Sequence, residues 1–187
     1  AMVFVTPSLW LPFHRYKQTH LQHHNDTHLT DPQLDPESYY LLPERWAEVQ
    51  GIRRTLYQFN QTLAGRMLIG PAISILQFWS SEFRDIMNGN RRTLAAWAWF
   101  VPACAITVWY VVHVCGMPFW QYVLLIAYPG ISLALVRSYC EHQAAPDVAH
   151  RTIIVEASPF WSLLFLNNNL HVAHHSMPSL AWYKLPA

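Results

Sequence analysis

The chain has 187 residues, enough for one domain, and only 12% of them are charged, about half of the usual share in a soluble globular protein. Aromatic residues reach 14%, and few charges with many amphipathic rings favour a protein that sits in a lipid bilayer. The formal net charge of +1 gives no indication of nucleic acid as a partner. The three cysteines form no C-x-x-C pair, so neither a disulfide framework nor a thiolate metal site is supported.

The first zone, residues 6–60, is polar and rich in histidine and proline. It contains a His-x-x-His-His pattern formed by His20, His23 and His24. On a helix this spacing brings three imidazoles to one face, although a single such pattern is usually only a solvated helix face. Asp26 and Asp31 follow closely and are placed to support a metal site, with a turn before Pro32 as the alternative role for Asp31.

Residues 61–79 are apolar but contain Arg66 and the pair Gly70-Pro71. A central arginine costs roughly 2.5–3.5 kcal/mol on membrane-insertion scales, and a Gly-Pro pair would kink a helix. We therefore expect an interfacial or re-entrant helix here rather than a full crossing.

Two apolar stretches follow, residues 94–115 and 119–136, separated by Gly116-Met117-Pro118. Each is about long enough to cross a bilayer, and together they predict a transmembrane hairpin. The alternative is a buried hairpin of a soluble protein. It is disfavoured because soluble helices normally have a polar face and these stretches have almost none.

Basic residues flank the hairpin on both sides, whereas its turn has none; they are Arg84, Arg91, Arg92, Arg137 and Arg151. By the positive-inside rule both flanks are cytoplasmic, so the histidines before and after the hairpin share one side of the membrane. The prediction is a single all-α domain over residues 1–187, an integral membrane helical bundle with a cytoplasmic histidine-rich helical cap.

A second His-x-x-His-His pattern follows the hairpin, formed by His171, His174 and His175. His142 lies just beyond the second span, next to Glu141, which could support a metal site or be merely solvated. Two copies of the pattern and a further histidine indicate a shared metal site. As a ligand, imidazole has a softness that by itself fits Fe, Zn, Cu or Ni. Six or seven histidines exceed the three or four ligands of one tetrahedral zinc, so two metals are expected.

These motifs, in this order, resemble the integral-membrane fatty acid desaturase family. The motifs are His20-x-x-His23-His24, Leu29-Thr30-Asp31-Pro32, Asp35-Pro36-Glu37-Ser38, Arg137-x-x-x-Glu141-His142 and Asn169-Leu170-His171-x-x-His174-His175. The resemblance implies that the first group matches the second histidine box, the last group matches the third, and His142 matches an additional ligand. It also implies that Asn168 or Asn169 is a polar neighbour of the metals. No first box precedes His20, and we expect that box upstream of Ala1.

The resemblance implies an enzyme that introduces a double bond into a lipid acyl chain, with O₂ as co-substrate. Two iron ions would be the cofactor, and no catalytic residue beyond the metal ligands is predicted. Electrons would come from an external donor such as a ferredoxin or a cytochrome b5-type protein. Hydroxylation or ketolation of a lipid or carotenoid uses related boxes and stays open as an alternative.

Two other classes of protein have weaker support from the sequence. A membrane zinc hydrolase would require a His-Glu-x-x-His motif, which the sequence lacks. A membrane metal- or haem-binding protein without catalysis is the other rival. Bis-histidine haem would need two histidines within facing spans, and only His113 lies inside one.

Overall fold

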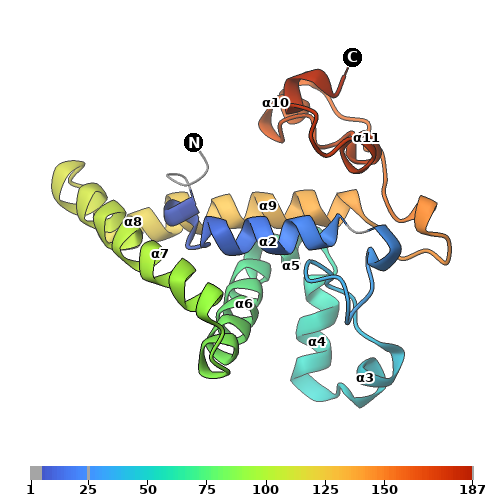
Figure 1. Ribbon diagram of the computed structural model, residues 1–187, viewed down its shortest axis with the longest axis horizontal. Coiled ribbons are helices and arrows are strands. Elements are labelled where there is room, and N and C mark those ends of the chain that lie inside the picture. The colour runs from blue at the N-terminus through green and yellow to red at the C-terminus, as the bar shows by residue number, and fades with distance from the viewer. Residues whose placement is uncertain (1–5, 25, 187) are drawn as a thin grey trace. The chain divides into compact units, whose positions relative to one another are not determined.

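The structure is a computed structural model that describes residues 6–24 and 26–186. Over these residues it is helical and contains no β-strand beyond the isolated bridges His142–Thr152 and Ile154–Leu170, which confirms the all-α prediction (Figure 1). The α-helices are α2 (Phe13–His23), α3 (Pro43–Glu48), α4 (Gly51–Asn60), α5 (Leu63–Leu68), α6 (Gly70–Met87), α7 (Arg91–Trp109), α8 (Phe119–Tyr122), α9 (Tyr128–Glu141), α10 (Pro159–Leu164) and α11 (His171–Ser176). The π-helices are η3 (Tyr110–Val114) and η4 (Val123–Ala127), and the 3₁₀-helices are η1 (Thr6–Leu9), η2 (Asp26–His28), η5 (Val148–His150) and η6 (Trp182–Lys184).

The chain forms two compact units. One comprises Ala1–Gln18 with Thr55–Leu135, and the other comprises Thr19–Arg54 with Val136–Ala187. The boundaries fall within α2, α4 and α9. The two apolar stretches predicted as spans belong almost wholly to the first unit, and both histidine patterns belong to the second.

Two continuous helices, Arg91–Val114 and Phe119–Glu141, are long and apolar enough to cross a membrane. Only 11% and 22% of their most apolar windows are buried, whereas the core helix of a soluble protein would be mostly buried. The first begins earlier than predicted because the Asn90 side chain accepts hydrogen bonds from the backbone N–H groups of Arg92 and Thr93. The predicted hairpin is therefore present as two apolar helices, while their crossing of a membrane stays a prediction.

The stretch at residues 61–79 is two helices rather than one. The Thr62 side chain caps α5, α5 ends at Leu68, and α6 then continues to Met87, well into the segment that looked polar. Pro71 lies in the first turn of α6, where no helical N–H is required, so it starts a helix instead of kinking one. Whether this segment lies at the membrane interface stays a prediction.

A buried ion pair ties α2, α6 and α7 together within the first unit. The Arg15 guanidinium donates to the Glu82 carboxylate at 2.7–2.9 Å, and the indole N–H of Trp97 donates to the same carboxylate at 2.9 Å. Asp85 accepts a further bond from Arg15 at 3.0 Å. A paired and hydrogen-bonded charge of this kind can be buried without a large desolvation penalty.

Close backbone contact at Gly65 leads to a prediction about stability. A Cβ at Gly65 would overlap the main-chain carbonyl of Phe59, whereas one at Gly70 would meet the side chains of Asn60 and Leu135 at 3.2 Å and the main-chain oxygen of Gly65 at an ordinary contact distance of 3.7 Å. We expect Gly65→Ala to destabilise the protein by about 1–3 kcal/mol or more, because backbone atoms must move. Thermal unfolding in detergent measures this, with Gly70→Ala as the matched control. Equal unfolding temperatures for the two variants would contradict the prediction.

Candidate metal centre

Three segments of the second unit supply the seven histidines singled out from the sequence. The end of α2, with the turn residue His24 directly after it, contributes the first pattern, α11 contributes the last pattern, and His142 directly follows α9. The turn before α11 has positive φ at Leu166 and Asn167, a backbone conformation that asparagine tolerates better than most residues. His142 is held by its bridge to Thr152. Both His-x-x-His-His patterns are thus helical, as the spacing indicated.

Four of the histidines form a buried group, hereafter the inner group; they are His23, His142, His171 and His175. Their Nε2 atoms meet in series: His23 to His142 at 3.0 Å, His142 to His171 at 2.9 Å, and His171 to His175 at 3.1 Å. All four candidate ligand atoms lie within 4.8 Å of one another.

The other three histidines form a partly exposed group, hereafter the outer group; they are His20, His24 and His174. The Nε2 atom of His24 lies 3.2 Å from that of His20 and 3.1 Å from that of His174. The two groups adjoin, because the rings of His24 and His175 have their centroids 4.3 Å apart. All seven predicted histidines are therefore brought together, in two neighbouring groups.

Three of the histidines, His20, His23 and His142, have a hydrogen-bond acceptor at the Nδ1 atom that faces away from the groups. The Nδ1 atom of His23 lies 2.9 Å from Asp35 Oδ1, and that of His20 lies 3.1 Å from Glu37 Oε1. His142 Nδ1 lies 3.2 Å from the main-chain carbonyl of Arg151. An acceptor at Nδ1 favours the tautomer with its proton there, which leaves the Nε2 lone pair pointing into the group.

The imidazole nitrogens of the two groups form a set of donor atoms that fits bound metal ions. Neutral imidazoles whose Nε2 lone pairs face one another at about 3 Å repel unless a proton or cation lies between them. Outward Nδ1–H groups held by carboxylates or carbonyls are the usual companions of metal-ligating histidines. The inner and outer groups together therefore have the chemistry of two adjacent imidazole metal sites.

Burial keeps most of these imidazoles neutral near pH 7. Desolvation, with repulsion from neighbouring imidazoles, lowers the pKa of His24, His142 and His174 to about 4 and that of His175 to about 2. The pKa of His171 is lowered further for the same reasons. At His23 burial also acts to lower the pKa, but the hydrogen bond to Asp35 and nearby carboxylates outweigh it and raise the pKa. Neutral imidazole is the form that binds metal.

Asp35 and Glu37 are candidate functional residues to which the sequence prediction gave no role at the site. The Asp35 carboxylate accepts hydrogen bonds from the backbone N–H groups of Thr30 at 2.8 Å and Glu37 at 2.9 Å, in addition to its contact with His23. The available signal was the Asp-Pro-Glu triplet soon after the first histidine pattern, in a chain with only 11 acidic residues. These two carboxylates orient histidines of the inner and outer groups, respectively.

Glu141 lies beside the inner group and is hydrogen-bonded to Asn168, while a supporting role near a metal stays a prediction for both residues. The Asn168 amide donates to Glu141 Oε1 at 2.7 Å, and Arg137 Nε lies 3.0 Å from the same oxygen. The other oxygen of Glu141 lies 3.7 Å from His171 Nδ1. Glu141 is thus paired with Asn168 and Arg137 and lies close to His171 without a hydrogen bond to it.

The remaining predicted supporting residues have other surroundings. The Asn169 amide donates to the carbonyl of Val155 at 3.0 Å. Asp31 Oδ1 accepts from the backbone N–H groups of Gln33 and Leu34 at 2.8 and 2.9 Å, as a turn residue does. The side chain of Asp26 lies outside the described residues. A role for these residues near a metal stays a prediction.

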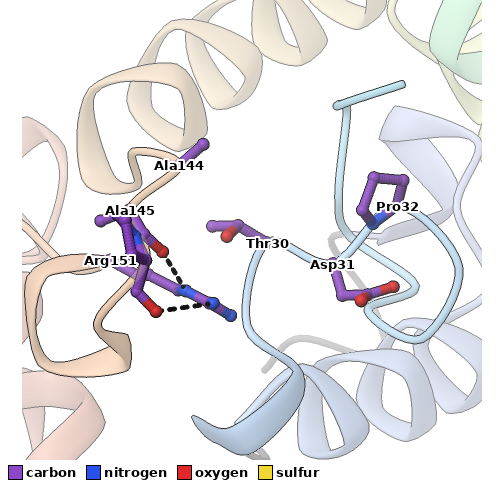
Figure 2. A pocket seen from close by; sticks show the side chains of 7 residues that line it. Thr30, Asp31, Pro32, Ala144, Ala145 and Arg151 are labelled. Atoms are coloured by element: carbon purple, nitrogen blue, oxygen red, sulfur yellow. Dashed lines mark hydrogen bonds between the residues drawn. The ribbon is translucent and has the colours of Figure 1, made fainter. Parts of the chain in front are cut away.

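Arg151 fixes the loop whose carbonyl holds His142. Its guanidinium donates to the carbonyls of Leu29 at 2.7 Å, Ala145 at 2.8 Å and Pro146 at 3.3 Å. Figure 2 shows this guanidinium on one wall of a surface pocket, opposite Thr30. Arg151 therefore donates its hydrogen bonds to backbone carbonyls and stabilises the segment that positions His142.

In a comparison with known families, a family model described as fatty acid desaturase matches the chain over residues 1–187. The match covers both histidine patterns and His142. No curated protein and no solved structure matches the chain.

Proposed function

The chain belongs to the fatty acid desaturase family, and on that premise we propose that it introduces a double bond into a lipid acyl chain at a di-iron centre. The overall change converts –CH₂–CH₂– to –CH=CH–. One O₂ takes up two hydrogens from the lipid, two electrons from an external donor and two protons, and leaves as two waters. A ferredoxin or a cytochrome b5-type protein is the class of donor that this reaction requires.

The observation that carries the proposal is the set of Nε2 atoms that face one another, together with the outward Nδ1 acceptors of His20, His23 and His142. The inner group would hold one iron and the outer group the other. Iron bound there would supply the redox chemistry that lets O₂ remove hydrogen from an unactivated C–H bond. Part of each iron's positive charge would be offset by Glu141, Asp35 and Glu37.

The protein's own residues orient the ligands. Asp35 and Glu37 each hold the Nδ1 side of one histidine, while Arg151 braces the loop carbonyl that holds His142. Burial of the inner group limits the access of water and favours neutral imidazole. These features keep the ligand nitrogens in place before metal binds, which is the preorganisation that a metal site needs.

We also propose that the protein is a multi-pass membrane protein with the metal centre on the cytoplasmic face. Support comes from the two apolar helices and from the arginines near their outer ends, Arg91 and Arg92 in the first turn of one and Arg137 near the end of the other.

Product analysis tests the reaction. We expect a host that expresses the full-length protein with an electron-donor system to accumulate lipids with a new double bond, measured by gas chromatography–mass spectrometry. A variant with both His174 and His175 replaced by alanine is the matched control. Hydroxylated or keto products in place of a double bond would overturn the assignment as a desaturase and would favour a hydroxylase or ketolase with related histidine boxes.

Metal analysis tests the centre independently. We expect about two irons per chain in protein purified without metal exchange, and we expect removal of iron by a chelator to lower the unfolding temperature, because ligands that bind only the folded state stabilise it. Zinc at about one per chain with no iron would instead favour a hydrolase. A haem absorbance band would favour an electron-transfer protein.

A further inference from the structure

Two loops of the histidine-bearing unit orient two neighbouring members of the inner group. Asp35, in the loop that follows η2, faces the Nδ1 atom of His23 at 2.9 Å. The main-chain carbonyl of Arg151, which directly follows η5, faces the Nδ1 atom of His142 at 3.2 Å. The Nε2 atoms of the same two histidines lie 3.0 Å apart. The position of one loop relative to the other therefore sets the distance between two candidate ligand atoms.

The side chain of Arg151 connects these two loops. Its Nη1 atom donates to the main-chain carbonyl of Leu29 at 2.7 Å, across 122 positions of the chain. The next residue, Thr30, donates its backbone N–H to Asp35 Oδ2 at 2.8 Å. With the two histidines these contacts close a ring, hereafter the support ring; its members in order are His23, Asp35, Thr30, Leu29, Arg151 and His142. Arg151 enters the ring twice, through its guanidinium and through its own carbonyl.

The support ring contains a residue in a strained backbone conformation. Thr30 has a φ of 66°, in the left-handed region that a β-branched residue seldom adopts. Such a conformation persists only where surrounding contacts hold it. Asp35 accepts from its N–H, and the Ser38 hydroxyl donates to its carbonyl at 3.0 Å. Arg151 holds the carbonyl directly before it. Loss of the guanidinium should therefore let this loop relax and draw Asp35 away from its histidine.

The contacts of Arg151 require the shape of a guanidinium and not only its charge. Three different nitrogens donate to three carbonyls: Nη1 to Leu29, Nε to Ala145 at 2.8 Å and Nη2 to Pro146 at 3.3 Å. The bonds to Ala145 and Pro146 are drawn in Figure 2. A lysine has one nitrogen and cannot occupy the three positions of this planar fork. Because all three acceptors are neutral carbonyls, the contacts fix geometry and do not pair charges.

We propose that Arg151 is a positioning residue of the inner metal site, which links the support of His23 to the support of His142 and so sets the distance between these two ligands. The inference rests on the proposed function and adds to it that one side chain serves two ligands from segments 119 positions apart. No member of the outer group belongs to the support ring. In that group His20 has its own carboxylate acceptor, Glu37, so the outer site should depend on Arg151 much less.

Titration of the iron-free, full-length protein in detergent with Co²⁺ tests this, because the visible absorption of bound Co²⁺ reports the geometry of its ligands. We expect the parent protein to bind two Co²⁺ per chain. Arg151→Ala should weaken one of them about 10–100-fold, the loss typical of residues that support a ligand, and the other no more than about 3-fold. The absorption of the weakened site should also change. Parental affinity at both sites, or equal weakening of both, would overturn the inference.

Two further variants separate geometry from general stability. Arg151→Lys keeps the charge and should show the same selective loss, and it decides the question if Arg151→Ala does not fold; parental affinity in Arg151→Lys would overturn the inference. Tyr40→Phe is the matched control. The Tyr40 hydroxyl also joins the two regions, but it contacts Ala144 at 3.0 Å and Tyr39 at 3.3 Å and no member of the support ring. Tyr40→Phe should therefore leave both Co²⁺ affinities unchanged.

A double-mutant cycle with His142→Ala provides a measurement that a merely structural role would not move. Without the His142 imidazole the support ring is open, so Arg151→Ala should then weaken Co²⁺ much less than it does in the parent protein. An equal loss in both backgrounds would show that Arg151 acts on folding in general and would overturn this inference alone. A parent protein that binds neither Co²⁺ nor iron would instead overturn the proposed function.

Discussion

Replacing His171 by alanine is expected to lower double-bond formation at least 100-fold and to deplete the purified protein of iron. His171 is only 1% exposed, and its Nε2 atom lies 2.9 Å from that of His142 and 3.1 Å from that of His175. It is therefore one of the two inner members of the series of four, and its loss removes the link between His142 and His175. The loss should exceed the roughly 10–100-fold typical of residues that only support a ligand. Iron per chain and lipid products are the measurements.

His150 provides the matched control for this substitution. It is exposed and belongs to neither histidine group, so His150→Ala should retain iron and activity within about two-fold, as surface substitutions usually do. Because a buried histidine could matter for folding alone, both variants should be compared after iron has been removed from each. Normal iron content in the His171 variant would refute the assignment of the inner group.

Replacing Asp35 by asparagine is expected to weaken iron binding about 10–100-fold and to destabilise the protein by about 1–3 kcal/mol. Both carboxylate oxygens are acceptors: Oδ1 faces His23 Nδ1 at 2.9 Å, and Oδ2 accepts from the Thr30 N–H at 2.8 Å. An amide of the same shape must present its NH₂ group to one of these two donors. Metal titration and thermal unfolding measure the two effects.

Asp31 supplies the control for Asp35. Its two turn hydrogen bonds, from Gln33 and Leu34, both end on Oδ1, so an asparagine can keep them. Asp31→Asn should therefore change iron affinity and stability little. If it proved as costly as Asp35→Asn, Asp31 would be a supporting residue of the metal site, as the sequence had suggested.

The features that the sequence predicted well are local ones. The spacing of His20, His23 and His24 already places them on one helix face, and the absence of charge over residues 94–115 already predicts an apolar helix. Short-range periodicity and composition are enough for such features. They do not show that His23 and His142, 119 positions apart, should meet, and for that the resemblance to a family was needed.

The features that escaped prediction depend on loops. Asp35 and Glu37 lie between prolines in a segment without periodicity. No sequence pattern therefore predicts their contacts with His23 and His20. The break at Ile69 between α5 and α6 was missed because Gly70-Pro71 was interpreted as a kink rather than as a helix start.

The wide separation of the ligands along the chain has a consequence for biosynthesis. His24 meets His174, 150 positions later, so the ribosome must release almost the whole described chain before either histidine group can assemble. A bound ion would close these long loops and remove the freedom of the chain between them. Newly made protein that has not received iron should be the form most readily degraded. The supply of iron would then set the amount of this protein in the cell as well as its activity.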